Sequence, residues 1–249
     1  MKKVAGMATI QARQESMFDT LKSLSPQLDE IHVYLNDYDS ISPIMKAKEL
    51  LLKNVKFHLG KNLDGDLGDA AKFYFAEEFK SDYYFTVDDD LIYSDTYVNK
   101  HIAHLNYFSN SIITTYHARS FTDFPLKGYL KPQTLMMHHA CLGTVSTAAW
   151  VQFGGTGVMC MVPEKVLFNK DIFGEERNIA DVWIGIHSQR NNIPILVIPH
   201  NVGEVLATDK IDHLKDSIWG ESVQEDRPCH LINKELDSLK FITAVKNLH

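Results

Sequence analysis

The stretch from Tyr83 to Tyr93, with the sequence YYFTVDDDLIY, constrains the fold more than any other part of the chain. Its first five residues are aromatic or β-branched, and a run of this length and composition is typical of a buried strand. Three carboxylates, Asp88, Asp89 and Asp90, follow directly. In open α/β sheets, ligands bind in the crevice at the carboxyl ends of the strands. The stretch therefore predicts a strand that brings acidic side chains to a ligand-binding crevice.

Three adjacent carboxylates repel one another unless cations lie beside them. Their hard oxygen atoms suit Mg²⁺ or Mn²⁺ carrying a diphosphate, so the stretch is interpreted as a metal and nucleotide site. The alternative is a solvated acidic turn in which Ser94 or Asp95 caps a following amphipathic helix. The three acids alone do not decide between these interpretations.

Apolar runs of strand length recur before the acidic stretch, and helical patterns separate them. The runs lie at residues 4–10, 31–35 and 55–59. Ser16, Ser42 and Asp69 are expected to cap the helices between them. The second helix is expected to bury Ile44, Ala47 and Leu51. Repeated strand and helix units predict a mainly parallel sheet with helices on both faces.

Polar residues follow these strands, where a ligand is expected. They are Thr9, Gln11 and Arg13 after the first strand, Asn36, Asp37 and Tyr38 after the second, and Asp69 and Lys72 in the third helix. Arg13 and Lys72 could neutralise a diphosphate. Asp37 could accept a hydrogen bond from a base or ribose, and Tyr38 could stack on the base. Each also has an ordinary alternative role, as a solvated surface charge or as the cover of a loop.

The second half of the chain is less regular. A strand is expected at residues 112–116, whereas residues 121–150 mix Pro, Gly, His and aromatic residues without a period, as in a loop-rich region that faces a substrate. Gly154 to Gly157 precede another strand, so they predict a close approach of backbone to ligand or an ordinary glycine hairpin. The glycines lack the spacing of a dinucleotide fingerprint and the ending of a P-loop.

A further acidic position, Asp181, stands at the start of a predicted helix that runs to Asn191. The helix amides at that end stabilise an ionised carboxylate, so Asp181 is suited to act as a general base. A strand at residues 193–198 is followed by His200, which could reach the metal. The alternatives are a helix cap for Asp181 and a hydrogen-bonded surface histidine for His200.

Bulk properties exclude several classes of protein. The net charge of −7 argues against a nonspecific nucleic-acid binder. The three cysteines are scattered and show neither a disulfide framework nor a zinc pattern. No export signal or membrane-spanning run is visible, so a cytoplasmic enzyme is expected.

The 249 residues are expected to form one domain with three parts. These are a nucleotide-binding half (1–110), an acceptor and catalytic half (111–205), and a carboxyl-terminal lid and helix (206–249). Residues 209–228 are expected to be the lid over the donor, because water must be kept from an activated sugar. A helix packed by Leu231, Leu236 and Leu239 is expected to anchor the lid.

In its order of features the chain resembles the GT-A-fold glycosyltransferases, especially the inverting nucleotide-sugar enzymes. That family has a nucleotide-binding sheet, an Asp-x-Asp motif ending a strand, a glycine-bearing loop, an acidic motif opening a helix, and a metal-binding His after the next strand. The corresponding stretches are the sheet up to Leu91, Asp88 to Asp90, Gly154 to Gly157, Ala180-Asp181, and Leu196 to Gly203. The resemblance covers residues 3–203, and Ala180 replaces the first acid of the usual Glu-Asp pair.

The resemblance implies an α/β fold: a GT-A-type, Rossmann-like, mainly parallel sheet flanked by helices, with a loop-rich acceptor region. It implies that Asp88 contacts the nucleotide ribose, with Asp89 beside it, that Asp90 and His200 bind Mn²⁺ or Mg²⁺, and that Asp181 deprotonates the acceptor. Further donor contacts are expected from Thr9, Gln11, Arg13, Asp37, Asp69 and Lys72.

The activity implied is transfer of a sugar from a nucleotide diphosphate sugar, a UDP-sugar, to a glycan or lipid-linked acceptor in surface polysaccharide biosynthesis. A lipid-linked acceptor would bring the protein to a membrane surface. One alternative is a sugar-1-phosphate nucleotidyltransferase, which normally has a glycine-rich loop after the first strand, whereas residues 8–14 contain no glycine. The other alternative is a non-catalytic nucleotide- or glycan-binding module of the same fold.

Overall fold

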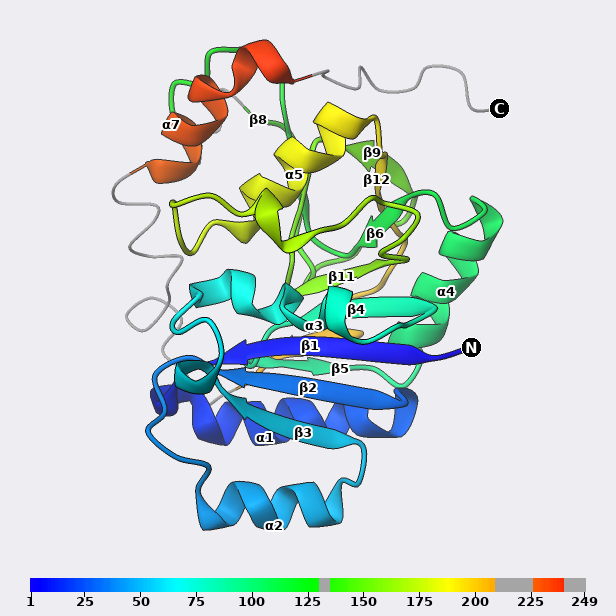
Figure 1. The fold of residues 1–249 in the computed structure, drawn as a ribbon. Coiled ribbons are helices and arrows are strands. Elements are labelled where there is room, and N and C mark those ends of the chain that lie inside the picture. Colours follow the sequence, from blue (N-terminus) through cyan, green and yellow to red (C-terminus); the bar gives the residue numbers. More distant parts are fainter. Residues whose placement is uncertain (130–134, 209–225, 240–249) are drawn as a thin grey trace.

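The computed structural model describes residues 1–129, 135–208 and 226–239, and these are organised around an eight-stranded mixed sheet (Figure 1). From edge to edge the strands are β3 (Val55–Leu59), β2 (Glu30–Leu35), β1 (Lys3–Thr9), β4 (Tyr83–Val87), β11 (Val158–Met161), β6 (Ile113–Thr115), β12 (Ile195–Val197) and β9 (Ala149–Val151). The first four are parallel to one another, and β12 is parallel to β6. β11 and β9 run antiparallel to their neighbours. The predicted α/β fold with a mainly parallel sheet is confirmed.

Two smaller sheets accompany the large one. One consists of β10 (Phe153–Gly154), β7 (Ala118–Phe121) and β8 (Leu135–His139), and the other of β13 (Val205–Ala207) and β5 (Leu91–Tyr93). The α-helices of the described residues are α1 (Gln14–Leu24), α2 (Pro43–Leu51), α3 (Phe75–Glu78), α4 (Tyr97–Tyr107), α5 (Ala180–Asn191) and α7 (Arg227–Lys234). A 3-10 helix, η4 (Gly68–Phe73), leads into α3. In Figure 1, α1 and α2 lie below β1, and α5 and α7 lie above it.

Strand β4 shows why helices cover both faces of the sheet. All five of its residues are buried. Tyr83, Phe85 and Val87 belong to an apolar cluster with residues of α1 and α4. Tyr84 belongs to a second cluster, with residues of η4, α3 and α5. Because successive strand residues face opposite ways, an unbroken apolar run is what a strand covered on both faces requires.

Two helix predictions are wrong in detail. α1 begins two residues before Ser16, so Ser16 lies inside the helix and does not cap it. The serine cap of α2 is confirmed, but Met45 is the buried residue of this helix, and Ile44, Ala47 and Leu51 are exposed. α2 packs against β3 at the edge of the sheet, where a narrow contact covers only one side chain.

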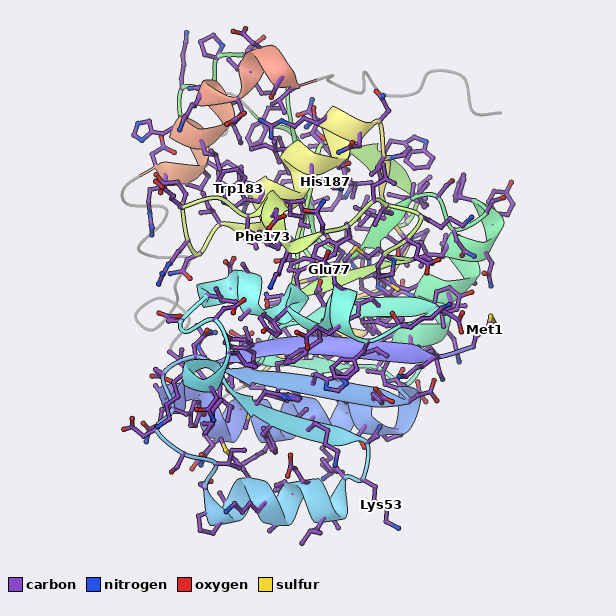
Figure 2. The ribbon with its side chains drawn as sticks, in the orientation of Figure 1. Met1, Lys53, Glu77, Phe173, Trp183 and His187 are labelled. Atoms are coloured by element: carbon purple, nitrogen blue, oxygen red, sulfur yellow. The ribbon has the colours of Figure 1, made fainter. Side chains whose placement is uncertain are left out.

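A third apolar cluster joins α5 to α7 and to the small sheet of β7 and β10. Val182 and Ile186 of α5 meet Leu231 of α7 in this cluster. Trp183 and His187 also lie on α5 (Figure 2), and the Trp183 indole Nε1 donates a hydrogen bond to the Glu176 carbonyl at 2.9 Å. Leu231 is buried in α7, and Leu236 and Leu239, which were predicted to pack the same helix, follow its end at Lys234 and join the same cluster.

Most of the predicted lid, residues 209–225, lies outside the described residues. Within the described part of the chain, no helix has both the length and the apolar character needed to cross a lipid bilayer.

Gly6 of β1 lets η4 lie directly on the sheet. A Cβ atom at this position would stand 1.9 Å from the Lys72 carbonyl oxygen and 2.2 Å from the Tyr84 hydroxyl oxygen. The Tyr84 hydroxyl donates a hydrogen bond to that same carbonyl at 2.8 Å. The absence of a side chain at Gly6 therefore sets how closely the backbone of Lys72 approaches β1 and β4.

Gly6→Ala is expected to destabilise the protein by about 1–3 kcal/mol, because the added methyl group must push η4 away from the sheet. Urea unfolding measures this loss. Gly143→Ala is the matched control, since the atom nearest to its Cβ would be the Ala140 carbonyl oxygen at 3.3 Å. Equal stability of Gly6→Ala and wild type would show that η4 does not pack as described.

Candidate functional site

A cavity of about 550 Å³ lies where β1 and β4 end, as the sequence predicted. Six of the predicted site residues line it: Arg13, Asp69, Lys72, Asp88, Asp90 and Asp181. Gly155, Thr156 and Gly157 of the predicted glycine loop also line it, whereas His117, Arg119, Tyr129, His138 and Asn178 were not singled out from the sequence. The fold thus gathers charged groups from η4, the end of β4, α5 and the small sheet around one space.

Asp88 is held by a cation on one side and a glycine on the other. The Lys72 ammonium contacts the Asp88 carboxylate, and the Lys72 side chain is 5% exposed. A Cβ atom on Gly157 would stand 1.9 Å from Asp88 Oδ2, so only glycine leaves room for the carboxylate. The Asp88 backbone N–H donates to the Tyr93 hydroxyl at 3.0 Å. The glycine loop therefore shapes the acidic site from directly beside it.

Burial lowers the pKa of Lys72, but the carboxylates of Asp88 and Asp69 more than offset this, so the pKa is raised above its ordinary value. Lys72 therefore remains a cation at neutral pH, and it compensates acidic groups that burial would otherwise leave unbalanced.

Arg13 balances the other two carboxylates of the stretch. Its Nη1 lies 3.0 Å from Asp89 Oδ1 and 3.5 Å from Asp90 Oδ2. Asp89 is 3% exposed, and burial raises its pKa to about 6 although Arg13 and a hydrogen bond from Thr9 lower it in part. Asp90 lines the cavity, whereas Asp89 is not among the lining residues. Asp89 therefore anchors Arg13, and Asp88 and Asp90 are the carboxylates presented to a ligand.

Asp181 is oriented by Thr156. Both the backbone N–H and the hydroxyl of Thr156 donate to Asp181 Oδ1, at 2.7 and 2.6 Å. No hydrogen bond from the described residues reaches Oδ2. Asp181 does not act as the cap of its own helix, because the N-cap position is Ile179. One carboxylate oxygen is thus fixed, and the other remains available at the cavity wall.

The cap of α5 comes from Asp69, 111 residues earlier in the chain. Asp69 Oδ2 accepts a hydrogen bond from the Ala180 N–H at 2.9 Å, and the Asp69 N–H donates to Asn178 Oδ1 at 3.3 Å. Asp69 was predicted to cap the helix that it begins, which is wrong: it lies inside η4 and caps α5 instead. Burial raises the pKa of Asp69 to about 6, partly offset by Lys72 and the Ala180 N–H.

The remaining donor-site predictions lie away from the lining of the cavity. The exposed Asp37 accepts a hydrogen bond from the Gln11 N–H at 2.7 Å. Tyr38 is buried in the core, and its hydroxyl donates to the Ile10 carbonyl at 3.1 Å, so the ring is not free to stack on a base. Thr9 is buried beside Asp89.

His200 does not lie at the cavity. Its ring is buried and stacks on Tyr116 with centroids 4.2 Å apart. Nδ1 lies 2.8 Å from the Ile198 carbonyl oxygen, and Nε2 lies 3.4 Å from the Ala140 carbonyl oxygen. The structure therefore does not bring His200 to Asp90, because the isolated bridge between His200 and Val145 holds it in the core.

The donor set at the cavity fits a hard divalent cation in part. Asp88 and Asp90 provide carboxylate oxygens, and Mg²⁺ or Mn²⁺ is commonly held by one or two carboxylates together with substrate phosphates. In the described part of the chain, no three His, Cys, Asp or Glu side chains are grouped as a complete metal site. The chemistry of the residues thus suits a cation shared with a diphosphate.

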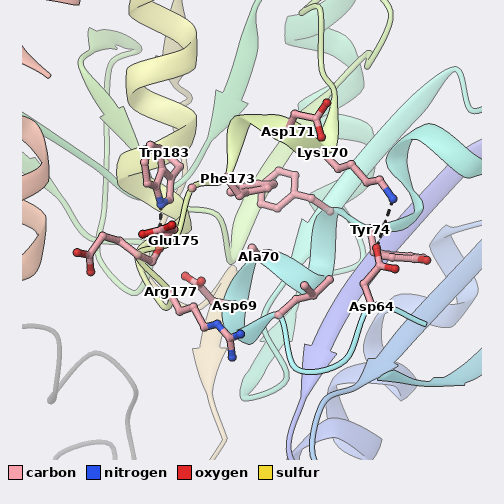
Figure 3. Close-up of a pocket in the computed structure, with 14 residues that line it drawn as sticks. Asp64, Asp69, Ala70, Tyr74, Lys170, Asp171, Phe173, Glu175, Arg177 and Trp183 are labelled. Carbon is pink, nitrogen blue, oxygen red and sulfur yellow. Dashed lines mark hydrogen bonds and ion pairs between the residues drawn. The ribbon is translucent and has the colours of Figure 1, made fainter. Parts of the chain in front are cut away.

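A second cavity, of about 470 Å³, adjoins the first at Asp69, which lines both. Aromatic side chains form much of its wall, including Phe173, Tyr74 and Trp183 (Figure 3). Its charged rim contains more acids than bases: Asp64, Asp69, Asp171, Glu175 and Glu176 against Lys170 and Arg177. Sequence periodicity did not point to it, because its residues come from η4 and from the irregular segment before α5.

No protein-family model and no curated protein matches the sequence. Solved structures do match the fold. S. aureus TarS 1–349 in complex with UDP-GlcNAc is 15% identical, with a TM-score of 0.58 over 87% of this chain and 61% of that one. GalNAc-T7 with UDP, GalNAc and Mn²⁺ is 11% identical, with a TM-score of 0.58 over 82% of this chain and 45% of that one. The protein therefore has the GT-A-type fold that the sequence resemblance implied, and it spans less than two thirds of these matched chains.

Asp69→Asn is expected to stabilise the protein above pH 6 and to have little effect below pH 4. The raised pKa of Asp69 means that the folded state favours the neutral carboxyl. Stability from this group is therefore complete below the unfolded pKa of about 3.9 and is lost as pH rises through about 6. Asparagine stays neutral and can still accept from the Ala180 N–H.

Melting temperatures of Asp69→Asn and wild type from pH 4 to 8 measure this effect, with the exposed Asp237→Asn as control. The difference between Asp69→Asn and wild type should grow with pH. A difference that is the same at every pH would contradict the assignment.

Proposed function

We propose that this protein is a metal-dependent glycosyltransferase that moves a sugar from a nucleotide diphosphate sugar, a UDP-sugar, to a hydroxyl group of a glycan or lipid-linked acceptor with inversion. The observation that carries the proposal is that one cavity of a GT-A-type fold holds the paired carboxylates Asp88 and Asp90 together with a separately oriented carboxylate, Asp181. Matched structures hold UDP-GlcNAc in one case and UDP, GalNAc and Mn²⁺ in the other, which supports this donor class.

Donor binding is assigned to the end of β4. Because His200 lies in the core, Asp88, for which the resemblance implied a ribose contact, is assigned with Asp90 to the metal. Both would hold Mn²⁺ or Mg²⁺ jointly with the donor diphosphate, and the cation would neutralise the charge that develops on the leaving diphosphate. Lys72 and Arg13 add fixed positive charge beside the same carboxylates. A ligand that displaces one of these ion pairs would find the released cation ready to bind phosphate oxygens.

Asp181 is assigned as the general base. The acceptor hydroxyl oxygen forms a bond to the anomeric carbon while the bond from that carbon to the diphosphate oxygen breaks. The hydroxyl proton passes to Asp181, whose Oδ2 is the oxygen not engaged by Thr156. Attack opposite the leaving group inverts the anomeric configuration. The two hydrogen bonds from Thr156 restrict rotation of the carboxylate, which keeps the accepting oxygen in one place.

A screen of nucleotide sugars for Mn²⁺-dependent hydrolysis or transfer tests the proposal. Turnover with release of UDP supports a glycosyltransferase. Release of pyrophosphate when UTP and a sugar 1-phosphate are supplied would instead identify a nucleotidyltransferase. Binding of donor without any turnover would identify a non-catalytic module.

Asp181→Asn is expected to slow transfer by about 10²–10⁴-fold, because asparagine keeps the shape and can still accept from Thr156 but cannot take the proton. The dissociation constant of UDP should stay within about twofold of wild type. The exposed Asp237→Asn is the control for the chemical change alone. An equal loss of UDP affinity and of transfer would place Asp181 in the donor site, and a product that retains the donor configuration would exclude the base role.

Asp90→Ala is expected to abolish the Mn²⁺-dependent part of UDP binding while leaving the fold intact. Arg13 keeps Asp89 as its partner at 3.0 Å, so the substitution does not leave a buried cation without a counter-ion. Calorimetry with UDP, in the presence and absence of Mn²⁺, measures the effect, and thermal melting checks the fold. If Mn²⁺ strengthens UDP binding to the variant as much as to wild type, Asp90 is not a metal ligand.

A further inference from the structure

Arg119 is a buried cation in the wall of the candidate site. It lies on β7, lines the cavity of the candidate site, and is 7% exposed. No carboxylate of the described residues forms an ion pair with it, and its Nε has no hydrogen-bond partner there. A guanidinium group stays protonated in proteins, and a buried charge is costly unless it is paired and hydrogen-bonded. Arg119 is therefore open to pairing with an anion that a ligand brings into the cavity.

Arg119 lies beside an aromatic ring and two histidines, and the carboxylates of Asp181 and Asp88 line the same cavity without forming an ion pair with it. The centre of the guanidinium group lies 4.9 Å from the centroid of the Tyr129 ring. His138 pairs with Arg119 across β7 and β8, which places both side chains on one face of the small sheet. His117, two residues before Arg119, has its ring 5.3 Å from that of His138. A cation, two imidazoles and a ring form a pocket suited to an oxyanion.

Arg119 belongs to the wall of the cavity that also carries the base. β10 pairs with β7 so that Phe153 stands opposite Arg119, and Thr156, three residues after Phe153, orients Asp181. Lys72 and Arg13 instead accompany the acids at the end of β4. The cavity therefore has cations from two parts of the fold: Arg13 and Lys72 pair with the acids at the end of β4, and Arg119 stands on the small sheet.

We infer that Arg119, with His117 and His138, forms a subsite for a carboxylate or phosphate group on the transferred sugar or on the acceptor, and not for the diphosphate of the nucleotide. The inference rests on the proposed function for its choice of substrate class. The planar fork of arginine binds two oxygens of a carboxylate or phosphate at once, which gives orientation as well as affinity. The substrate of this enzyme is therefore an acidic saccharide, such as one that contains a uronic acid or a phosphorylated sugar.

The side-chain Nε–H resonance of Arg119 in NMR spectra tests the subsite without any need for activity. The resonance is assigned by its loss in Arg119→Lys, and the full chain is titrated with sodium glucuronate, with sodium phosphate, and with glucose at the same ionic strength. The expected result is a saturable shift with glucuronate or phosphate and none with glucose. No shift with either anion, or an equal shift with glucose, would overturn the inference.

Calorimetry then assigns the anion to its source. If the anion belongs to the donor sugar, wild type should bind UDP-glucuronate about 10- to 100-fold more tightly than UDP-glucose, and Arg119→Gln should bind both alike. If it belongs to the acceptor, the two donors should bind alike, and glucuronate or phosphate should still shift the Arg119 resonance in protein saturated with UDP and Mg²⁺. The inference is overturned if UDP itself competes with glucuronate or phosphate for the site. It is also overturned if Arg119→Gln lowers the affinity for UDP as much as it lowers the affinity for UDP-glucuronate, because the site then belongs to the diphosphate.

Arg190→Gln serves as the matched control, because Arg190 is paired with Glu235 and does not line the cavity. Thermal melting shows whether Arg119→Gln is folded, and the titration of wild type decides the inference even if it is not. Failure of wild type to bind UDP would reject the proposed function, whereas the glucuronate and phosphate titrations would still decide whether Arg119 binds an oxyanion.

Discussion

The compensation of buried charge at the end of β4 is the constraint on which the site depends. Asp89 is almost fully buried, as is the Lys72 side chain that contacts Asp88. Removing charges from water costs several kcal/mol for each ion unless oppositely charged groups and hydrogen bonds replace the water. Arg13 and Lys72 supply those charges, from the segment after β1 and from η4. The sheet can therefore end in three acids only because two other elements bring cations to it.

The same requirement explains how α5 is joined to the amino-terminal strands. Asp69 and Lys72 lie on one 3-10 helix, so the element that compensates Asp88 also caps α5 through the Ala180 N–H. α5 in turn carries Asp181, which Thr156 of the glycine loop holds. The acidic stretch, the helix cap and Asp181 are thus connected through hydrogen bonds, in addition to the apolar cluster that Tyr84 shares with η4 and α5. A displacement of η4 would therefore disturb the acidic stretch, the cap of α5 and Asp181 together.

Local patterns were sufficient for the longer elements of the large sheet, but not for short strands such as β7 and β8 or for the partners of site residues. The acidic stretch and the place of Asp181 at a helix start could be predicted because apolar strand runs and helix starts are recognised from neighbouring residues. His200 was predicted as a metal ligand from its place after a strand, yet its ring is held between two backbone carbonyls and Tyr116. Arg119 was not singled out at all, because it stands in a short strand next to a stretch without periodicity.

The sequence by itself determined the class of fold, the strand that ends in acids, and the position of a second carboxylate at a helix start. These features depend on residues within a few positions of one another. Such residues set the local backbone conformation and decide which face of a helix or strand is buried. Only the tertiary structure decided that Arg13 meets Asp89 across 76 residues, that Asp69 caps a helix 111 residues away, and that Arg119 stands in the cavity wall without an ion pair to any carboxylate of the described residues. Such pairings depend on which strand ends lie side by side, and strand order is set by the packing of the whole sheet.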